Sequence, residues 1–102
     1  MSRAGQYICI VLPSSARAYV FGSVISDRNR ANDIDVLVVY DRGAVSPGSI
    51  YQLLRPFASG LSRCAGLPVH LTVLTQEEEA ADDFIRRLNC VPLHDWIGSV
   101  AP

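Results

Sequence analysis

The sequence predicts an α/β (or α+β) domain in which helices pack on a small mixed β-sheet. Three observations support this class: short apolar runs alternate with helical patterns, 49% of the residues are hydrophobic, and 102 residues is the size of one domain. The chain shows no internal repeat, linker or low-complexity segment. We therefore expect residues 1–102 to form a single domain.

Two strands and a long helix are expected in the first part of the chain. Ala16–Phe21 and Ile34–Tyr40 are predicted strands, and the second is mostly β-branched and too short for a typical helix. Ser46 and Pro47 are suited to the N-cap and first turn of a helix. Pro56 lies inside that helical pattern, so we expect a kink or a split there. The apolar positions that define the pattern are Ile50, Leu53, Leu54, Phe57, Ala58 and Leu61.

The second part adds a strand, a helix and an edge strand. Residues 69–74 form the third expected strand. Thr75 and Glu78 have the spacing of a capping box, so a helix should begin there and run to about Asn89. Residues 91–93 are suited to an edge strand, and we expect the residues after them to form a loose tail.

Charge and cysteine content exclude several classes of protein. Nine arginines, no lysine and ten carboxylates give a formal charge of −1, which excludes a coat that binds nucleic acid by bulk positive charge. Cys9, Cys64 and Cys90 are widely spaced without a CxxC pair, which favours buried thiols over disulfides or a zinc site. The longest apolar run, residues 7–12, is far too short to span a membrane. A cytoplasmic protein without membrane contact is expected.

The residues that indicate chemistry lie where the first strand ends and the second begins. Gly22 and Ser23 follow one strand, and Asp33-Ile34-Asp35 opens the next. Residues i and i+2 of a strand share a face, so Asp33 and Asp35 present paired carboxylates whose repulsion a divalent cation would relieve. Glycine allows close backbone approach, and a serine at a helix N-terminus can bind phosphate. Either half alone is more often a turn or a solvated strand end, but together they predict phosphoryl or nucleotidyl transfer.

With this two-part motif the chain resembles the minimal nucleotidyltransferases of the polymerase-β-like superfamily. Their signature is a strand ending in Gly-Ser, a short spacer, and Asp-hydrophobic-Asp on the next strand. The resemblance implies that Gly22 and Ser23 hold the triphosphate of ATP, and that Asp33 and Asp35 bind Mg²⁺. Larger members add a second domain that holds the acceptor. For this chain we expect the acceptor to be supplied by a partner protein or within a homo- or hetero-oligomer.

Two departures from the family pattern concern His70 and the arginines. Many members carry a third carboxylate on the third strand, where this chain has His70. That histidine is suited to act as a general base near neutral pH or to accept a softer ion such as Mn²⁺, and an edge histidine without a role is equally open. Many relatives also have an arginine near Gly-Ser. Arg28 and Arg30 are candidates for that phosphate contact, although solvated loop residues are the simpler interpretation of each.

Three functional hypotheses follow. Among minimal members, the description fits antitoxins paired with HEPN-domain ribonuclease toxins, and the resemblance implies transfer of AMP from ATP to a tyrosine of the toxin. The second hypothesis is a binding module that keeps the fold but neutralises its partner by stoichiometric contact, motivated by the missing third carboxylate. The third is a nucleotidyltransferase acting on RNA. Six of the ten carboxylates follow residue 76, which makes the C-terminal part the expected surface for a basic partner.

Overall fold

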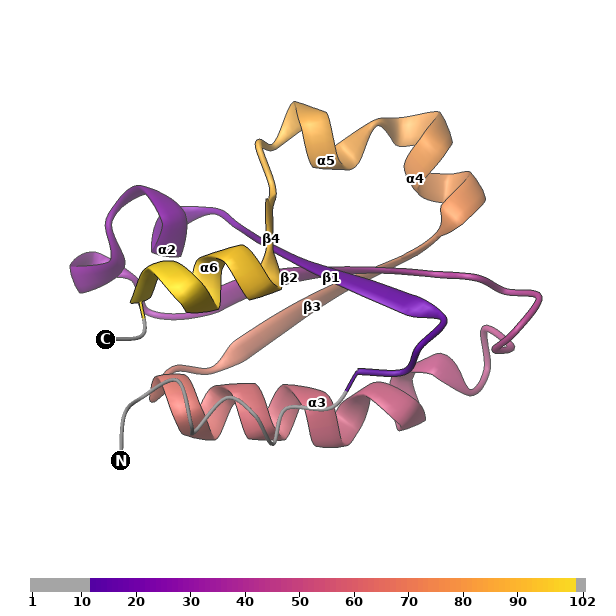
Figure 1. The fold of residues 1–102 in the computed structure, drawn as a ribbon, viewed down its shortest axis with the longest axis horizontal. Helices are drawn as coiled ribbons and strands as arrows, with labels where there is room; N and C mark the ends of the chain where they lie inside the picture. The colour runs from indigo at the N-terminus through magenta and orange to yellow at the C-terminus, as the bar shows by residue number, and fades with distance from the viewer. Residues whose placement is uncertain (1–11, 101–102) are drawn as a thin grey trace.

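Four strands form one mixed sheet with helices on both faces (Figure 1). The computed structural model describes residues 12–100. The strands are β1 (Ala16–Phe21), β2 (Ile34–Tyr40), β3 (Val69–Thr75) and β4 (Val91–Pro92), in the order β3-β2-β1-β4. β1 is antiparallel to both β2 and β4, whereas β3 is parallel to β2. The predicted fold class is therefore confirmed.

The helices cover the two faces unequally. They are α2 (Ser23–Ser26), the single 3₁₀ turn η1 (Arg28–Arg30), α3 (Ile50–Ala65), α4 (Gln76–Asp82), α5 (Phe84–Arg87) and α6 (Leu93–Val100). The long α3 lies along one face, and the short α4 and α5 arch over the opposite face (Figure 1). Within the described residues, no helix has the length and apolar character needed to cross a bilayer.

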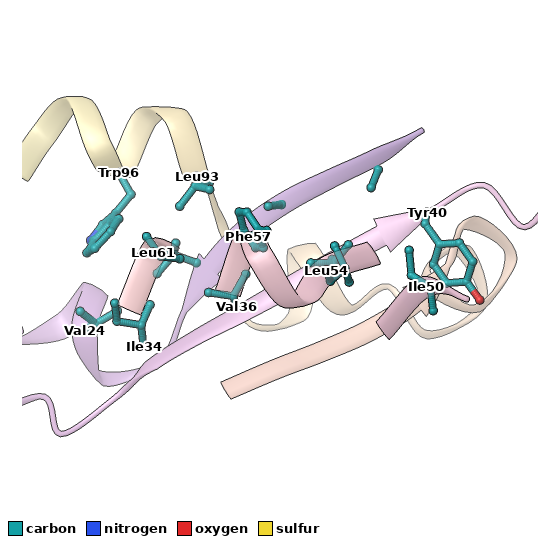
Figure 2. Close-up of a cluster of buried hydrophobic side chains, with 14 residues drawn as sticks. Val24, Ile34, Val36, Tyr40, Ile50, Leu54, Phe57, Leu61, Leu93 and Trp96 are labelled. Atoms are coloured by element: carbon teal, nitrogen blue, oxygen red, sulfur yellow. The ribbon is translucent and has the colours of Figure 1, made fainter. Parts of the chain in front are cut away.

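The main hydrophobic core lies between α3 and the sheet (Figure 2). Side chains alternate along a strand, so Val20, Ile34 and Val36 all face α3, and each is fully buried. The α3 side chains that meet them recur every three or four residues, as expected for the buried stripe of a helix. They are Ile50, Leu54, Phe57 and Leu61, none more than 1% exposed.

The expectation of a loose tail is wrong for the described residues, because residues 93–100 form α6. Leu93 and Trp96 are one helical turn apart and both are buried in the main core (Figure 2). Figure 2 shows Trp96 near Leu61 and Val24, so the tail closes the end of the core that α3 leaves open. The expected edge strand is present, although it has only two residues, Val91–Pro92.

The α3 helix begins later than predicted and is not split. Ser46 is not its N-cap. The Ser49 backbone N–H donates to the Ser46 carbonyl in a turn that precedes the helix, and the helix starts at Ile50. Pro56 lies inside the uninterrupted helix. Its ring faces solvent, where water can satisfy the carbonyl of Gln52 that lacks the usual donor.

One predicted helix after β3 is in fact two. The capping box is confirmed. The Thr75 side chain accepts a hydrogen bond from the Glu78 backbone N–H, and the Glu78 carboxylate accepts one from the Thr75 backbone N–H. Asp83 then adopts a left-handed conformation (φ 56°) and ends α4. The turn allows Phe84 to pack edge-to-face on Phe21, with ring centroids 5.2 Å apart. Of the cysteines predicted to be buried, Cys64 and Cys90 are only half-buried, and Cys9 lies outside the described residues.

Candidate metal and nucleotide site

Asp33, Asp35 and His70 come together at one end of the sheet. Asp35 lies directly opposite His70 in the parallel β2–β3 ladder, and Asp33 immediately precedes β2. One ligand atom from each side chain lies within 4.8 Å of the other two, and His70 Nδ1 is 3.3 Å from Asp33 Oδ2. The Ile34 amide donates to the Pro68 carbonyl and fixes the start of this ladder. Adjacent backbone strands therefore hold all three side chains.

The site concentrates negative charge that is partly shielded from water. Burial raises the pKa of the Asp35 carboxyl above its ordinary value, and the neighbouring Asp33 raises it further, while His70 opposes both effects. His70 and Asp33 are more open, with side chains 65% and 30% exposed. A bound cation would lower the cost of ionising Asp35, and the open side leaves room for further ligands.

Gly22 joins the first half of the motif to the second. Phe21 pairs with Asp35 across the β1–β2 ladder, so the glycine after it lies against the Asp35 side chain. A Cβ atom at Gly22 would be 2.5 Å from Asp35 Oδ2, a distance that no real side chain tolerates. The glycine also has φ 83° and ψ −154°, which is accessible almost only to glycine. Asp35 therefore reaches its place because position 22 has no side chain.

Ser23 and the two loop arginines follow Gly22 in the chain. Ser23 is exposed and is the first residue of α2, as predicted. Arg30 is 89% exposed at its side chain and pairs with Asp27 at 3.5 Å, rather than with the acidic cluster. Arg28 is half-buried in the same 3₁₀ turn. The structure thus brings Gly22, Asp35, Asp33 and His70 together and leaves the arginines in the neighbouring loop.

The donor set fits a divalent cation. Two carboxylates and one imidazole nitrogen can each supply one ligand, with the separations given above. Carboxylates are typical ligands of Mg²⁺ and Mn²⁺, and the imidazole extends the range to other transition ions. The remaining coordination positions would be open to water or phosphate oxygens.

A cleft on the face of the sheet that carries Asp35 has no local sequence motif. It has a volume of about 410 Å³ and lies between the sheet and the α4–α5 segment, where Arg17, Tyr19, Val39, Glu79 and Ile85 line it. Arg17 pairs with Val39 further along the ladder in which Phe21 pairs with Asp35. Four separate elements supply these residues, which is why no sequence pattern indicates them.

The acidic C-terminal segment already has local interactions. Asp82 pairs with Arg87, and Asp83 pairs with Arg86, each at 2.6 Å. Glu79 accepts a hydrogen bond from the Ile85 amide. These carboxylates therefore interact within the α4–α5 segment, and a basic partner at this surface remains a prediction.

The fold and the acid cluster together define a class of proteins that transfer phosphorus-containing groups from nucleotides. In this mixed sheet, a glycine-serine turn lies beside paired carboxylates, an arrangement suited to binding phosphate and a metal ion. The family model described as nucleotidyltransferase domain matches residues 8–93. The chain therefore belongs to the nucleotidyltransferase domain family, and nucleotidyl transfer is its general activity. No curated protein and no solved structure matches the chain.

Proposed function

We propose that the protein transfers AMP from ATP to a hydroxyl group of a partner protein, with a divalent ion held by Asp33 and Asp35. The observation that supports this proposal is the close approach of Gly22 to Asp35, where an added Cβ would be 2.5 Å from Asp35 Oδ2. Family membership supports the type of reaction, and the donor set supports the ion.

Each residue of the site has a defined task in this proposal. The Gly22–Ser23 backbone and the Ser23 hydroxyl bind the triphosphate, because the glycine leaves space for close approach. Asp33 and Asp35 would hold the divalent ion, which would offset the phosphate charge when bound. The acceptor oxygen then forms a bond to the α-phosphorus, and the bond from that phosphorus to pyrophosphate breaks. The acceptor proton is released to solvent.

A protein acceptor is supported by the position of the site and by the resemblance in the motif. His70 lies on β3, an edge strand of the sheet, and is largely exposed, so a side chain of another protein can reach the cluster. The resemblance to antitoxins of HEPN-type toxins suggests a tyrosine of such a toxin as acceptor. The wide spacing of the cysteines in the sequence supports a cytoplasmic setting for this proposal.

Label transfer from ATP to the partner tests this proposal. The purified chain is incubated with α-labelled or γ-labelled ATP, Mg²⁺ or Mn²⁺, and the protein encoded by the neighbouring reading frame. The proposal predicts that only α-label appears on the partner and that Asp35→Asn abolishes it. Asp95→Asn is the matched control, because Asp95 is exposed and pairs with His94 far from the cluster in sequence. Absence of α-label with the wild-type chain contradicts the proposal.

Two further outcomes identify the alternatives. If the partner is neutralised without ATP, and the double variant Asp33→Asn, Asp35→Asn neutralises it equally well, the chain is a stoichiometric binding module. The replacement of the family's third carboxylate by His70 is the observation that favours this alternative. If α-label appears on RNA and not on protein, the acceptor class in the proposal is wrong.

A further inference from the structure

His70 distinguishes this site from a purely carboxylate site. The structure gives two roles to compare for the imidazole: a base that contacts the acceptor, or a ligand of the ion. Its Nδ1 is 3.3 Å from Asp33 Oδ2. That separation is close to the distance of roughly 3 Å between neighbouring ligands of an octahedral ion with bonds of about 2.1 Å. The separation is that of an ion pair, and it is also compatible with two ligands of one ion.

We propose that Asp33, Asp35 and His70 form a three-ligand site that selects a divalent first-row transition ion over Mg²⁺ and binds it without nucleotide. This inference rests on the metal site in the proposed function and deepens it. The ligand atoms lie within 4.8 Å of one another, so small side-chain movements bring them around one ion. Two carboxylates alone rely on substrate phosphates to complete the site for Mg²⁺, whereas a third protein ligand reduces that dependence.

Backbone pairing holds the three ligands in place before an ion arrives. Asp35 and His70 are register partners in a parallel ladder that runs from Ile34 and Val69 to Tyr40 and Thr75. Asp33 is one residue outside the strand. It is anchored by the hydrogen bond that the neighbouring Ile34 amide donates to the Pro68 carbonyl. Ligands on paired strands need less reordering than ligands on loops, which favours binding of the ion alone.

The ligand chemistry sets the selectivity. Mg²⁺ is a hard ion that prefers oxygen, and imidazole nitrogen binds it weakly compared with Co²⁺, Ni²⁺ or Zn²⁺. A site with one nitrogen and two carboxylate oxygens therefore gains more affinity for transition ions than a three-carboxylate site does. Replacing His70 with aspartate should weaken the preference for transition ions over Mg²⁺.

Metal titration of the tag-free chain without nucleotide or partner tests the inference. Co²⁺ is titrated alone and in competition with Mg²⁺, followed by its visible absorption and by NMR of the hyperfine-shifted imidazole N–H. We expect Co²⁺ to bind at least about 100-fold more tightly than Mg²⁺, and His70→Asp to reduce that ratio by at least roughly 10-fold. The shifted exchangeable N–H signal should be present in the wild type and absent in His70→Asp.

His94→Ala provides the matched control. The chain has two histidines, and His94 is exposed and pairs with Asp95 at 2.9 Å. This variant should keep the wild-type ion selectivity and the shifted signal. His70 is 65% exposed, so His70→Asp should fold, and His70→Asn provides a second ligand change without an added charge. Circular dichroism establishes that each variant is folded.

Several results overturn the inference. Equal ion selectivity in the wild type and folded His70→Asp would show that the imidazole is not a ligand, as would a shifted N–H that persists in that variant. A thiolate-to-cobalt charge-transfer band would place the ion on a cysteine instead. Selective binding of Co²⁺ without label transfer would contradict the proposed function only. Label transfer with unchanged ion selectivity in His70→Asp would contradict the present inference only.

Discussion

Replacing Gly22 with alanine adds a methyl group where the structure has the Asp35 carboxylate. The new Cβ would be 2.5 Å from Asp35 Oδ2, so either the backbone or the aspartate must move. A carboxylate on a rotatable side chain moves more easily than a turn fixed between β1 and α2. We therefore expect Asp35 to rotate out of the cluster in the Gly22→Ala variant.

Two effects of different size follow from this displacement. Alanine at φ 83° and ψ −154° is strained by about 1–3 kcal/mol, which lowers the melting temperature by about 4–8 °C for each kcal/mol in a domain of this size. Moving Asp35 also removes one ligand of the proposed ion. Mutating a residue that supports a metal site typically reduces the affinity for the metal roughly 10–100-fold, and we expect the affinity for Co²⁺ to fall by that order.

Thermal unfolding in EDTA and calorimetric Co²⁺ titration separate these effects. Gly66→Ala is the control for strain: Gly66 has φ 73°, but a Cβ there would meet nothing within 4 Å. It should lose about 1 kcal/mol and keep its affinity for Co²⁺. Gly48→Ala controls for the substitution itself, because it has neither strain nor contact. If Gly22→Ala binds Co²⁺ as tightly as Gly66→Ala does, the coupling between Gly22 and Asp35 is refuted.

Three further predictions concern stability. Asp35→Asn should raise the melting temperature of the metal-free protein at neutral pH. Because the folded-state pKa of Asp35 is raised, the stability that the protonated carboxyl provides is lost as pH rises through that pKa. Thermal melts at decreasing pH should therefore show the difference in melting temperature between variant and wild type closing. Phe57→Ala should cost about 3–5 kcal/mol in urea unfolding because the ring is 1% exposed, whereas Leu53→Ala, at a side chain 48% exposed, should cost far less. Thr75→Ala should cost about 1 kcal/mol through loss of the capping box, and no change in the urea midpoint would contradict that role.

Local patterns predicted the elements whose signals lie within a few residues. The β-branched run of β2 and the Thr75 capping box both appear in the structure at the expected positions. The start of α3 was misplaced because Ser46-Pro47 has the composition of a helix start but forms a turn closed by Ser49. Short-range chemistry alone does not distinguish a turn from the first turn of a helix.

Tertiary contacts account for the elements that were missed. The pattern after Thr75 is compatible with one helix, and the break at Asp83 is tied to Phe84 packing on Phe21, which is far away in the sequence. The C-terminal segment becomes a helix with Trp96 buried in the core between α3 and the sheet. Neither contact is visible in a local window of sequence.

The residues of the candidate site could be predicted from the sequence, but the close approach of Gly22 to Asp35 could not. The spacing placed Asp33 and Asp35 on one face, and the family resemblance pointed to His70 on the third strand. The structure brings these three side chains together. The contact of Gly22 with Asp35 depends on the β1–β2 register, which the sequence does not specify by itself. Roles for Arg28 and Arg30 in phosphate binding remain predictions.

Anomalous diffraction from crystals grown with Mn²⁺ and a non-hydrolysable ATP analogue tests the central claim most directly. We expect a manganese peak bound by Asp33, Asp35 and His70, with the triphosphate against the Gly22–Ser23 backbone. A manganese peak away from these three side chains, or a triphosphate bound elsewhere with the cluster empty, would contradict the account.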